Sequence, residues 1–376
     1  MVDIDIYSYI VRPDSLTIWS NEEVRDRLRW YYQVMKGYKP PKYIISKYVP
    51  VEYDEEYLNQ LDINELFEIH RGYREDFLEL YRDVENGLNI DELDRAKYNF
   101  LDLKIYIAYR LLRRCGLCEW GCGVDRYNGR RGVCGLGREA YVASAFLHYG
   151  EEAPLVPSGT IFFSGCSLKC VFCQNWDISQ RAGEGVEVSP RDLADIAMRL
   201  ARAGARNINY VGGNPDQNLH IILESLKYMD IWIPLLWNSN MYMTIEALEL
   251  LLDIVDIWLP DFKWWIDDHA FRYSRIKRYR EVVSRNIKMV YDYGSDIIIR
   301  HLVMPNHVEC CTIPILEWIS RNTPKVLVNI MDQYRPEYKA AYDERFREIS
   351  RRITIGEYKK ATDKAKKLKI VFEPIS

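Results

Sequence analysis

The chain has 376 residues, 48% of them hydrophobic, and a formal net charge of −4. This length and hydrophobic content are sufficient for a large core and more than one domain. The slightly acidic balance argues against a nucleic acid partner, and the lack of any run of about 18 apolar residues argues against a membrane span.

The sequence contains nine cysteines. Its first residues, MVDIDIYSYIVRPDSL, lack the basic start and apolar stretch of a signal peptide, so we expect a cytoplasmic protein. In that reducing compartment, cysteines are more often metal ligands or catalytic groups than disulfides. The many Tyr, Arg and Ile residues and the few Gln residues are typical of a thermophile protein.

Residues 1–110 are expected to form a helical N-terminal domain. One helix is expected to open at Asn21, because acidic residues follow it in the first turn. A second helix is expected to open at Asn89, where Glu92 completes a capping-box pattern. We find no cluster of catalytic residue types in this region.

Residues 111–150 form a segment that is rich in cysteine and glycine. Four cysteines follow the spacing C-x2-C-x3-C-x11-C, namely Cys115, Cys118, Cys122 and Cys134. Four thiols at this density match a closed metal site, either zinc or an auxiliary iron–sulfur cluster. Free thiols or a redox pair are the alternative.

From residue 160 onward, short β-rich runs alternate with helical patterns. The six predicted strands cover residues 160–163, 207–211, 231–237, 255–259, 296–304 and 325–331. Helices are expected after the caps Ser189 and Thr244. This α/β alternation predicts a parallel sheet, and six units instead of eight predict a partial (β/α)6 barrel over residues 151–340. A C-terminal helix with a capping box at Thr354 and Glu357 is expected in residues 341–376.

The stretch SGCSLKCVFCQN places Cys166, Cys170 and Cys173 directly after the first predicted strand. In α/β barrels the reactive groups lie at the carboxyl ends of the strands. Thiolates are soft ligands that suit zinc or iron–sulfur clusters. A structural zinc site is closed by four ligands, whereas three thiolates on a four-iron cluster leave one iron open to a substrate or cofactor. A zinc site with a distant fourth ligand and buried free thiols are the alternatives.

This triplet resembles the cluster-binding motif of the radical S-adenosylmethionine (radical SAM) superfamily. Five longer stretches between about residues 112 and 340 resemble its PflX-like branch, which is related to pyruvate formate-lyase activating enzyme. They read GTIFFSGCSLKCVFCQNWDISQ, YVGGNPDQNL, WLPDFKWW, IIIRHLVMPNH and VNIMDQYRPEYKA.

The resemblance implies a [4Fe–4S] cluster on Cys166, Cys170 and Cys173, whose open iron is chelated by SAM. Transfer of one electron, from a reductant such as ferredoxin or flavodoxin, would release a 5′-deoxyadenosyl radical that abstracts hydrogen from the substrate. The resemblance also assigns Asn175 to the neighbourhood of the cluster and Phe172 to packing against the adenine. For Phe172, simple packing within the loop is the alternative.

Polar groups follow the other predicted strands as well. Gly212, Gly213 and Asn214 end the second strand, where the glycines would allow close approach of a ligand and where the superfamily commonly has an acid in place of Asn214. Further candidate ligands for the cofactor are Asn238, Asp261, Lys263 and Arg300, the last of which could pair with the carboxylate of SAM. We expect His301 to be structural.

Three functions are compatible with these features. The first is a radical SAM enzyme that acts on a protein or peptide, as activating enzymes do. The second is the same chemistry on a small molecule, a lipid or RNA, and it predicts that the helical domain covers the barrel mouth. The third is an iron–sulfur or zinc scaffold for interactions. The adjacent Cys310 and Cys311 are expected to be buried apolar residues, because neighbouring cysteines rarely bind one metal.

Overall fold

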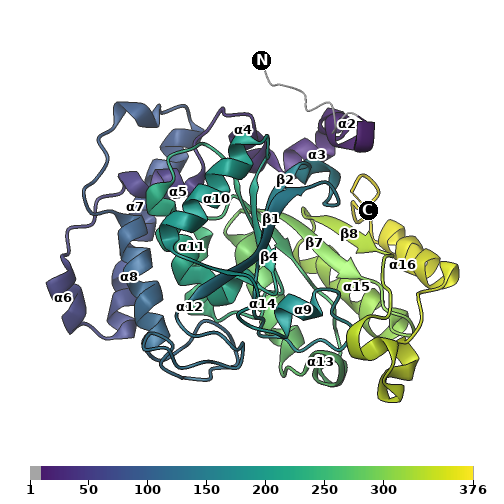
Figure 1. Ribbon diagram of the computed structural model, residues 1–376. Helices are drawn as coiled ribbons and strands as arrows, with labels where there is room; N and C mark the ends of the chain where they lie inside the picture. Colours follow the sequence, from purple (N-terminus) through teal and green to yellow (C-terminus); the bar gives the residue numbers. More distant parts are fainter. Residues whose placement is uncertain (1–9, 376) are drawn as a thin grey trace.

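The structure is a computed structural model that describes residues 10–375 (Figure 1). Residues 1–9 of the predicted helical domain, and residue 376, lie outside the described part. One eight-stranded sheet has the order β3-β1-β2-β4-β5-β6-β7-β8. Its strands are β1 (Ala140–His148), β2 (Ser158–Phe163), β3 (Val186–Val188), β4 (Ile208–Gly212), β5 (Leu235–Ser239), β6 (Ile257–Pro260), β7 (Asp296–Leu302) and β8 (Leu327–Met331).

The six strands that the sequence predicts, β2 and β4 to β8, are parallel neighbours in that order. Together with the helices between them they form the expected open, partial α/β barrel (Figure 1). The helices that follow β2 are α9 (Trp176–Ser179), α10 (Pro190–Arg202), α11 (Leu219–Ser225), α12 (Ile245–Leu252), α13 (Asp267–Ser274), α14 (Tyr279–Asp292), α15 (Ile313–Asn322) and α16 (Ile355–Lys367). The predicted caps of α10, α12 and α16 all accept the expected backbone hydrogen bonds.

Sequence reasoning missed the two strands at the edge of the sheet. β1 pairs antiparallel with β2 on one side and with the three-residue β3 on the other. Both have weak sequence signals, because β1 contains Ala and Ser at half-exposed or exposed positions and β3 is very short. β1 lies within the stretch that we assigned to the cysteine-rich segment, so the sheet begins before the predicted barrel boundary.

The described part of the N-terminal region is helical. It contains α2 (Asp14–Thr17), α3 (Glu22–Arg27), α4 (Arg29–Met35), α5 (Lys42–Ile45), α6 (Glu55–Gln60), α7 (Ile63–Glu85) and α8 (Phe100–Arg113). Asn21 caps α3 as predicted, but Asn89 opens only a short 3-10 turn. The long helix α8 begins ten residues later, with Asn99 and Asp102 as its capping box.

The N-terminal segment lies against the amino ends of the barrel strands. The indole Nε1 of Trp30 donates to Asp256 (2.8 Å), which precedes β6, and the backbone N–H of Tyr31 donates to Asp296 (2.7 Å), the first residue of β7. Apolar side chains of α3 and α4 share a core cluster with residues of β5 to β8. Among the described helices, none combines the length and apolar composition that a membrane span needs.

Helices α7 and α8 pack on the outside of the barrel. The Lys104 ammonium is completely buried and lies 2.6 Å from the Asp253 carboxylate at the end of α12. Arg74 from α7 pairs with the same carboxylate at 3.2 Å. Because these contacts and the main hydrophobic core both join the helices to the barrel, the two parts are packed as one body.

Candidate functional site

The loop after β2 carries the predicted cluster cysteines, and we refer to residues 164–175 as the triplet loop. Its backbone is fixed by the end of α13. The N–H groups of Lys169 and Val171 donate to the carbonyls of Ser274 (2.9 Å) and Tyr273 (2.8 Å). A helix about 100 residues away along the chain therefore holds the loop in position for its thiols.

The three thiols of the triplet loop all line one cavity. Cys170 Sγ lies 3.2 Å from the Ser274 hydroxyl, and Cys173 Sγ lies 3.2 Å from the Ser179 hydroxyl. Burial raises the pKa of all three thiols, including Cys166, and that of Cys170 to about 12. Three enclosed sulfur atoms with hydroxyl groups beside them form a donor set suited to a soft, positively charged metal centre.

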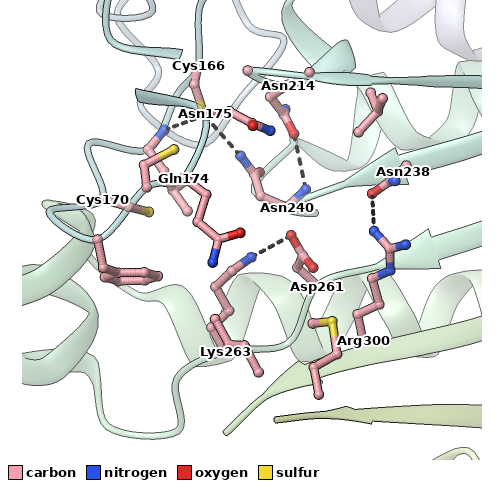
Figure 2. Close-up of a pocket in the computed structure, with 18 of the residues that line it drawn as sticks. Cys166, Cys170, Gln174, Asn175, Asn214, Asn238, Asn240, Asp261, Lys263 and Arg300 are labelled. Atoms are coloured by element: carbon pink, nitrogen blue, oxygen red, sulfur yellow. Dashed lines mark hydrogen bonds and ion pairs between the residues drawn. The ribbon is translucent and has the colours of Figure 1, made fainter. Parts of the chain in front are cut away.

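The cavity has a volume of about 240 Å³ and opens at the carboxyl ends of the parallel strands (Figure 2). The structure brings together at this cavity every residue that the sequence assigns to catalysis or cofactor binding. They are Cys166, Cys170, Cys173, Phe172, Asn175, Gly212, Gly213, Asn214, Asn238, Asp261, Lys263 and Arg300. The other lining residues are Leu168, Gln174, Val211, Asn240, Leu302, Met331, Gln333 and Tyr334.

The two glycines after β4 allow the protein chain, not only a ligand, to approach closely. A Cβ on Gly212, whose φ is +115°, would lie 2.2 Å from the backbone nitrogen of Phe163. A Cβ on Gly213 would lie 2.2 Å from the carbonyl oxygen of Gly165 in the triplet loop. The end of β4 therefore packs directly against β2, and the residue after it packs directly against the triplet loop, so a side chain at either position would push the segments in contact apart.

Amide side chains connect the loops after β4 and β5. The backbone N–H of Asn240 donates to Asn214 Oδ1 at 3.1 Å, and Asn240 Nδ2 lies 3.5 Å from Cys166 Sγ. These contacts are shown in Figure 2. Asn238 Nδ2 is buried in the cavity wall without a hydrogen-bond partner among the described residues. Because an unpaired buried donor costs free energy, this amide is suited to donate to a ligand in the cavity.

Arg300 has internal partners that sequence reasoning missed. Its Nε and Nη2 atoms donate to Glu152 at 2.8 and 2.9 Å, and Nη2 also pairs with Glu151. Burial opposes ionisation of Glu151, but Arg300 lowers the pKa of that carboxyl to about 2. Only Nη1 faces Asn238 across the cavity wall, at 3.5 Å from its Oδ1. The Arg300 guanidinium can therefore bind a ligand carboxylate only while it also remains paired with Glu151 and Glu152.

The remaining predicted ligands are Asp261 and Lys263, which follow β6, and Phe172 in the triplet loop. Lys263 Nζ forms an ion pair with Asp261, as expected for two residues on one face of an extended segment. Phe172 is 5% exposed and packs between Trp264 and Tyr334, with ring centroids 5.7 and 6.2 Å away. Much of the Phe172 ring is thus used in packing within the protein, and the rest faces the cavity.

His301 is buried with both ring nitrogens in hydrogen bonds. Nδ1 contacts the carbonyl of Phe262 (2.7 Å) and Nε2 contacts the hydroxyl of Thr312 (2.8 Å). Burial lowers its pKa to about 4, so the ring is neutral at pH 7. His301 does not line the cavity, which agrees with the structural role expected for it.

The four cysteines of the cysteine-rich segment, Cys115, Cys118, Cys122 and Cys134, lie beside the triplet loop and not in the cavity. The Trp120 indole donates to the carbonyl of Ser167 at 2.7 Å and so joins the two regions. A Cβ on Gly132 would lie 3.3 Å from Cys122 Sγ and 3.5 Å from Cys134 Sγ. The fully buried Arg126 places its Nη1 3.9 Å from Cys115 Sγ. A buried cation beside several thiols matches the negative charge of thiolate ligands.

Sequence reasoning also missed four lining residues outright. They are Leu168, Gln174, Leu302 and Met331. Gln174 follows the last cysteine of the triplet directly and could have been found by its position. Leu302 and Met331 lie within predicted strands and end β7 and β8, but their apolar side chains resemble those of any other strand residue.

Comparisons with known proteins identify the family. The sequence model of the Radical SAM superfamily matches residues 160–319, which include the triplet loop. The uncharacterized protein MJ0674 of Methanocaldococcus jannaschii is 42% identical over 348 residues, which are 91% of this chain and 97% of that protein. Protein MJ0808 of the same organism, also uncharacterized, is 24% identical over 185 residues, 46% of this chain and 50% of that protein.

Among solved structures, Streptococcus suis SuiB bound to S-adenosylmethionine matches 49% of this chain and 44% of its own length, with 18% identity and a TM-score of 0.35. This chain thus spans less than half of SuiB. The family implies an iron–sulfur cluster and SAM, and the three enclosed thiols and the unpaired Asn238 amide fit such groups. On the family match and the identity to MJ0674, the chain belongs to the radical SAM superfamily of enzymes.

Proposed function

We propose that this protein holds a [4Fe–4S] cluster on Cys166, Cys170 and Cys173, binds SAM in the adjoining cavity and acts on a protein or peptide, as an activating enzyme does. The observation that carries the proposal is the set of three thiols, two buried and one half-buried, that face one cavity at the strand ends. Among the described residues, no further cysteine and no histidine lines that cavity. A closed structural site would need a fourth such ligand, so the donor set is suited to leave one metal position open.

When bound, the cluster and SAM supply reductive cleavage of a carbon–sulfur bond and removal of a hydrogen atom from the substrate. The residues of this chain position and tune them. Ser274, Ser179 and Asn240 place hydrogen-bonding groups beside the thiols, and such contacts shift the reduction potential of a cluster. In this proposal Asn238 Nδ2 donates to SAM, and Lys263 places a cation near Cys170 and Cys173.

The surroundings of the cavity favour a polypeptide substrate. The described part of the helical region, residues 10–113, contributes no residue to the cavity lining, because its first helices lie at the opposite end of the strands. Gln174 and Asn175 are exposed at the rim. Beside them, Trp176 stacks on Tyr338 with ring centroids 5.3 Å apart. A rim with amide and aromatic groups suits an extended polypeptide backbone. The small-molecule hypothesis requires the N-terminal helices to cover the cavity mouth, but those described from residue 10 onward do not line it.

The proposed electron source is a cytoplasmic one-electron carrier such as ferredoxin or flavodoxin. Spectroscopy of the reduced protein tests the cluster itself. Anoxically purified protein should be brown and, after reduction with dithionite, should give an electron paramagnetic resonance signal that changes shape when SAM is added. Cys170→Ala should remove the part of the signal that SAM changes, whereas Ser144→Ala, on the exposed side of β1, should retain it. A reduced signal that SAM leaves unchanged would argue against an open iron position.

We also propose that Cys115, Cys118, Cys122 and Cys134 bind a second metal centre, either zinc or an auxiliary cluster. Its support is that two of these thiols, Cys122 and Cys134, lie beside Gly132 and that the buried Arg126 contacts a third, Cys115. About eight irons per chain would indicate two cubane clusters, and about four irons together with zinc would indicate one. Cys118→Ser should lower the metal content of this second centre and leave the signal of the triplet cluster in place.

A further inference from the structure

A group of four metal-binding side chains lies outside both cysteine sites. His269 belongs to α13, and His307, Cys310 and Cys311 lie on the segment between β7 and α15. The ligand atoms of all four residues lie within 4.8 Å of one another. None of them lines the cavity of the triplet loop. No role in the proposed radical chemistry uses them.

The spacing of these atoms matches a tetrahedral zinc ion. His307 Nδ1 lies 3.4 Å from Cys310 Sγ, and His269 Nδ1 lies 3.5 Å from Cys311 Sγ and 3.8 Å from Cys310 Sγ. Zinc–sulfur bonds of about 2.3 Å and zinc–nitrogen bonds of about 2.0–2.1 Å, arranged tetrahedrally, place nitrogen and sulfur ligands about 3.5 Å apart. The four side chains therefore already stand near the corners that zinc would require.

The local backbone explains how adjacent cysteines can face one point. Residues Val308–Thr312 form a π-helical turn directly before α15. Such turns are rare and occur mostly at functional sites, because they change the direction of side chains within a helix. Cys310 is half-exposed and lies against His307 and His269, so the expectation of a buried apolar residue is wrong for it.

Hydrogen bonds around the group favour ligation as well. Tyr273 Oη donates to the Glu348 carboxylate at 2.6 Å and lies 3.3 Å from His307 Nε2. With its hydrogen directed to Glu348, the Tyr273 oxygen accepts from Nε2–H, which leaves the Nδ1 lone pair of His307 facing Cys310. A carboxylate that orients a histidine in this way is typical of metal sites.

We propose that His269, His307, Cys310 and Cys311 form a structural zinc site that ties α13 to the start of α15. Four protein ligands would close the coordination sphere, which is characteristic of a structural site and not of a catalytic one. Two thiolates and two neutral imidazoles would balance the charge of Zn²⁺. The last residues of α13 accept hydrogen bonds from the backbone of the triplet loop, so a zinc site that fixes α13 would also stabilise the position of that loop.

Zinc analysis of the full-length protein tests this assignment. Zinc per chain should fall by one in His269→Ala and in Cys311→Ser, relative to the unchanged protein and to the control His148→Ala. His148 is a half-exposed histidine on β1, far from the proposed ligands in sequence and in the sheet. Because the test compares the zinc content of each variant with that of the unchanged protein, it is valid whether the quartet Cys115, Cys118, Cys122 and Cys134 contains zinc or iron. Equal zinc in all four proteins would overturn the proposal.

Zinc-edge X-ray absorption of the unchanged protein gives a second readout that does not depend on a variant folding. The spectrum should contain imidazole nitrogen scattering at about 2.0–2.1 Å as well as sulfur at about 2.3 Å. This holds even if the quartet adds an all-sulfur zinc ion to the average. A zinc spectrum with sulfur alone, or a disulfide between Cys310 and Cys311 in the anoxic protein, would contradict the proposed site.

Discussion

At the scale of single residues, Gly213 shows how tightly the candidate site is assembled. The position of its missing Cβ is 2.2 Å from a carbonyl oxygen of the triplet loop, nearer than any real side-chain carbon approaches. The obstacle is backbone, which cannot rotate away as a flexible side chain can. The close packing of the loop after β4 against the triplet loop therefore requires a residue without a Cβ at position 213.

Replacing this glycine should therefore damage the metal site. We expect Gly213→Ala to displace the triplet loop and to lower the iron content of the anoxically purified protein severalfold. Gly72→Ala is the matched control, because Gly72 lies within α7 with nothing within 4 Å of an added Cβ. Alanine there should stabilise the helix by about 0.5–1 kcal/mol and leave iron binding unchanged. Full iron content in Gly213→Ala would contradict this account of the loop packing.

The Arg300 cluster sets a second expectation at this scale, for pH. The folded-state pKa of Glu151 is about 2, below its ordinary value of 4.5, because the opposing effect of burial is outweighed by Arg300 together with His148. A depressed carboxyl pKa stabilises the fold above pH 4.5, and this contribution is lost as the pH falls towards 2.

Urea unfolding between pH 6 and pH 2.5 measures this dependence. The midpoint of the unchanged protein should fall steeply below pH 4.5, and Glu151→Gln should show a shallower fall over the same range. Glu56→Gln, at an exposed position, should follow the unchanged protein. If Glu151→Gln and the unchanged protein had parallel profiles, the ion pair would not carry the proposed charge interaction.

At the scale of elements, sequence reasoning succeeded where the signal is local. The caps Ser189, Thr244 and Thr354 were found because each side chain bonds a backbone group within its own turn. The six parallel strands were found because buried strands are continuously apolar. Asn89 was wrong as the start of a long helix, because a second capping box at Asn99 lies nearer the apolar stripe and begins α8.

The difference between local and long-range signals also explains which residues of the candidate site could be predicted from the sequence. The triplet and the polar strand ends could be predicted, because parallel strands bring their carboxyl ends to one edge. Glu152 could not, because its partner Arg300 lies 148 residues away and nothing in either local sequence identifies the other. The edge strand β1 was missed for a related reason. Its pairing with β2 is decided by the finished sheet and not by its own Ala- and Ser-containing sequence.

The junction between α8 and α12 should behave as a buried ion pair. Lys104→Met would leave the Asp253 carboxylate with Arg74 and the Tyr293 hydroxyl but without its shortest ion pair, and we expect a loss of about 3–5 kcal/mol in the free energy of unfolding. Lys97→Met, at an exposed position before α8, should change stability by less than about 0.5 kcal/mol. Thermal unfolding of the two variants side by side makes the comparison. Equal melting temperatures would show that the helices are not anchored through Lys104.

At the scale of the whole molecule, different segments of the chain pack against the two ends of the barrel. The N-terminal helices lie against the amino ends of the strands, where Trp30 and Tyr31 bond to buried carboxylates. The triplet loop and the cysteine-rich segment occupy the carboxyl ends and are joined by Trp120. The described N-terminal helices thus pack against the amino ends of the strands and the outside of the barrel (Figure 1), and none of their residues lines the cavity.

The measurement that tests the central claim most directly is the formation of 5′-deoxyadenosine from SAM. Anoxically prepared protein, reduced with dithionite in the absence of any substrate, should release this nucleoside, and Cys166→Ala should abolish its release. Ser144→Ala, prepared in parallel, should keep the activity of the unchanged protein. Release at the same rate from Cys166→Ala, or none from unchanged protein with a full complement of iron, would contradict the proposal that three thiols leave one metal position open for SAM.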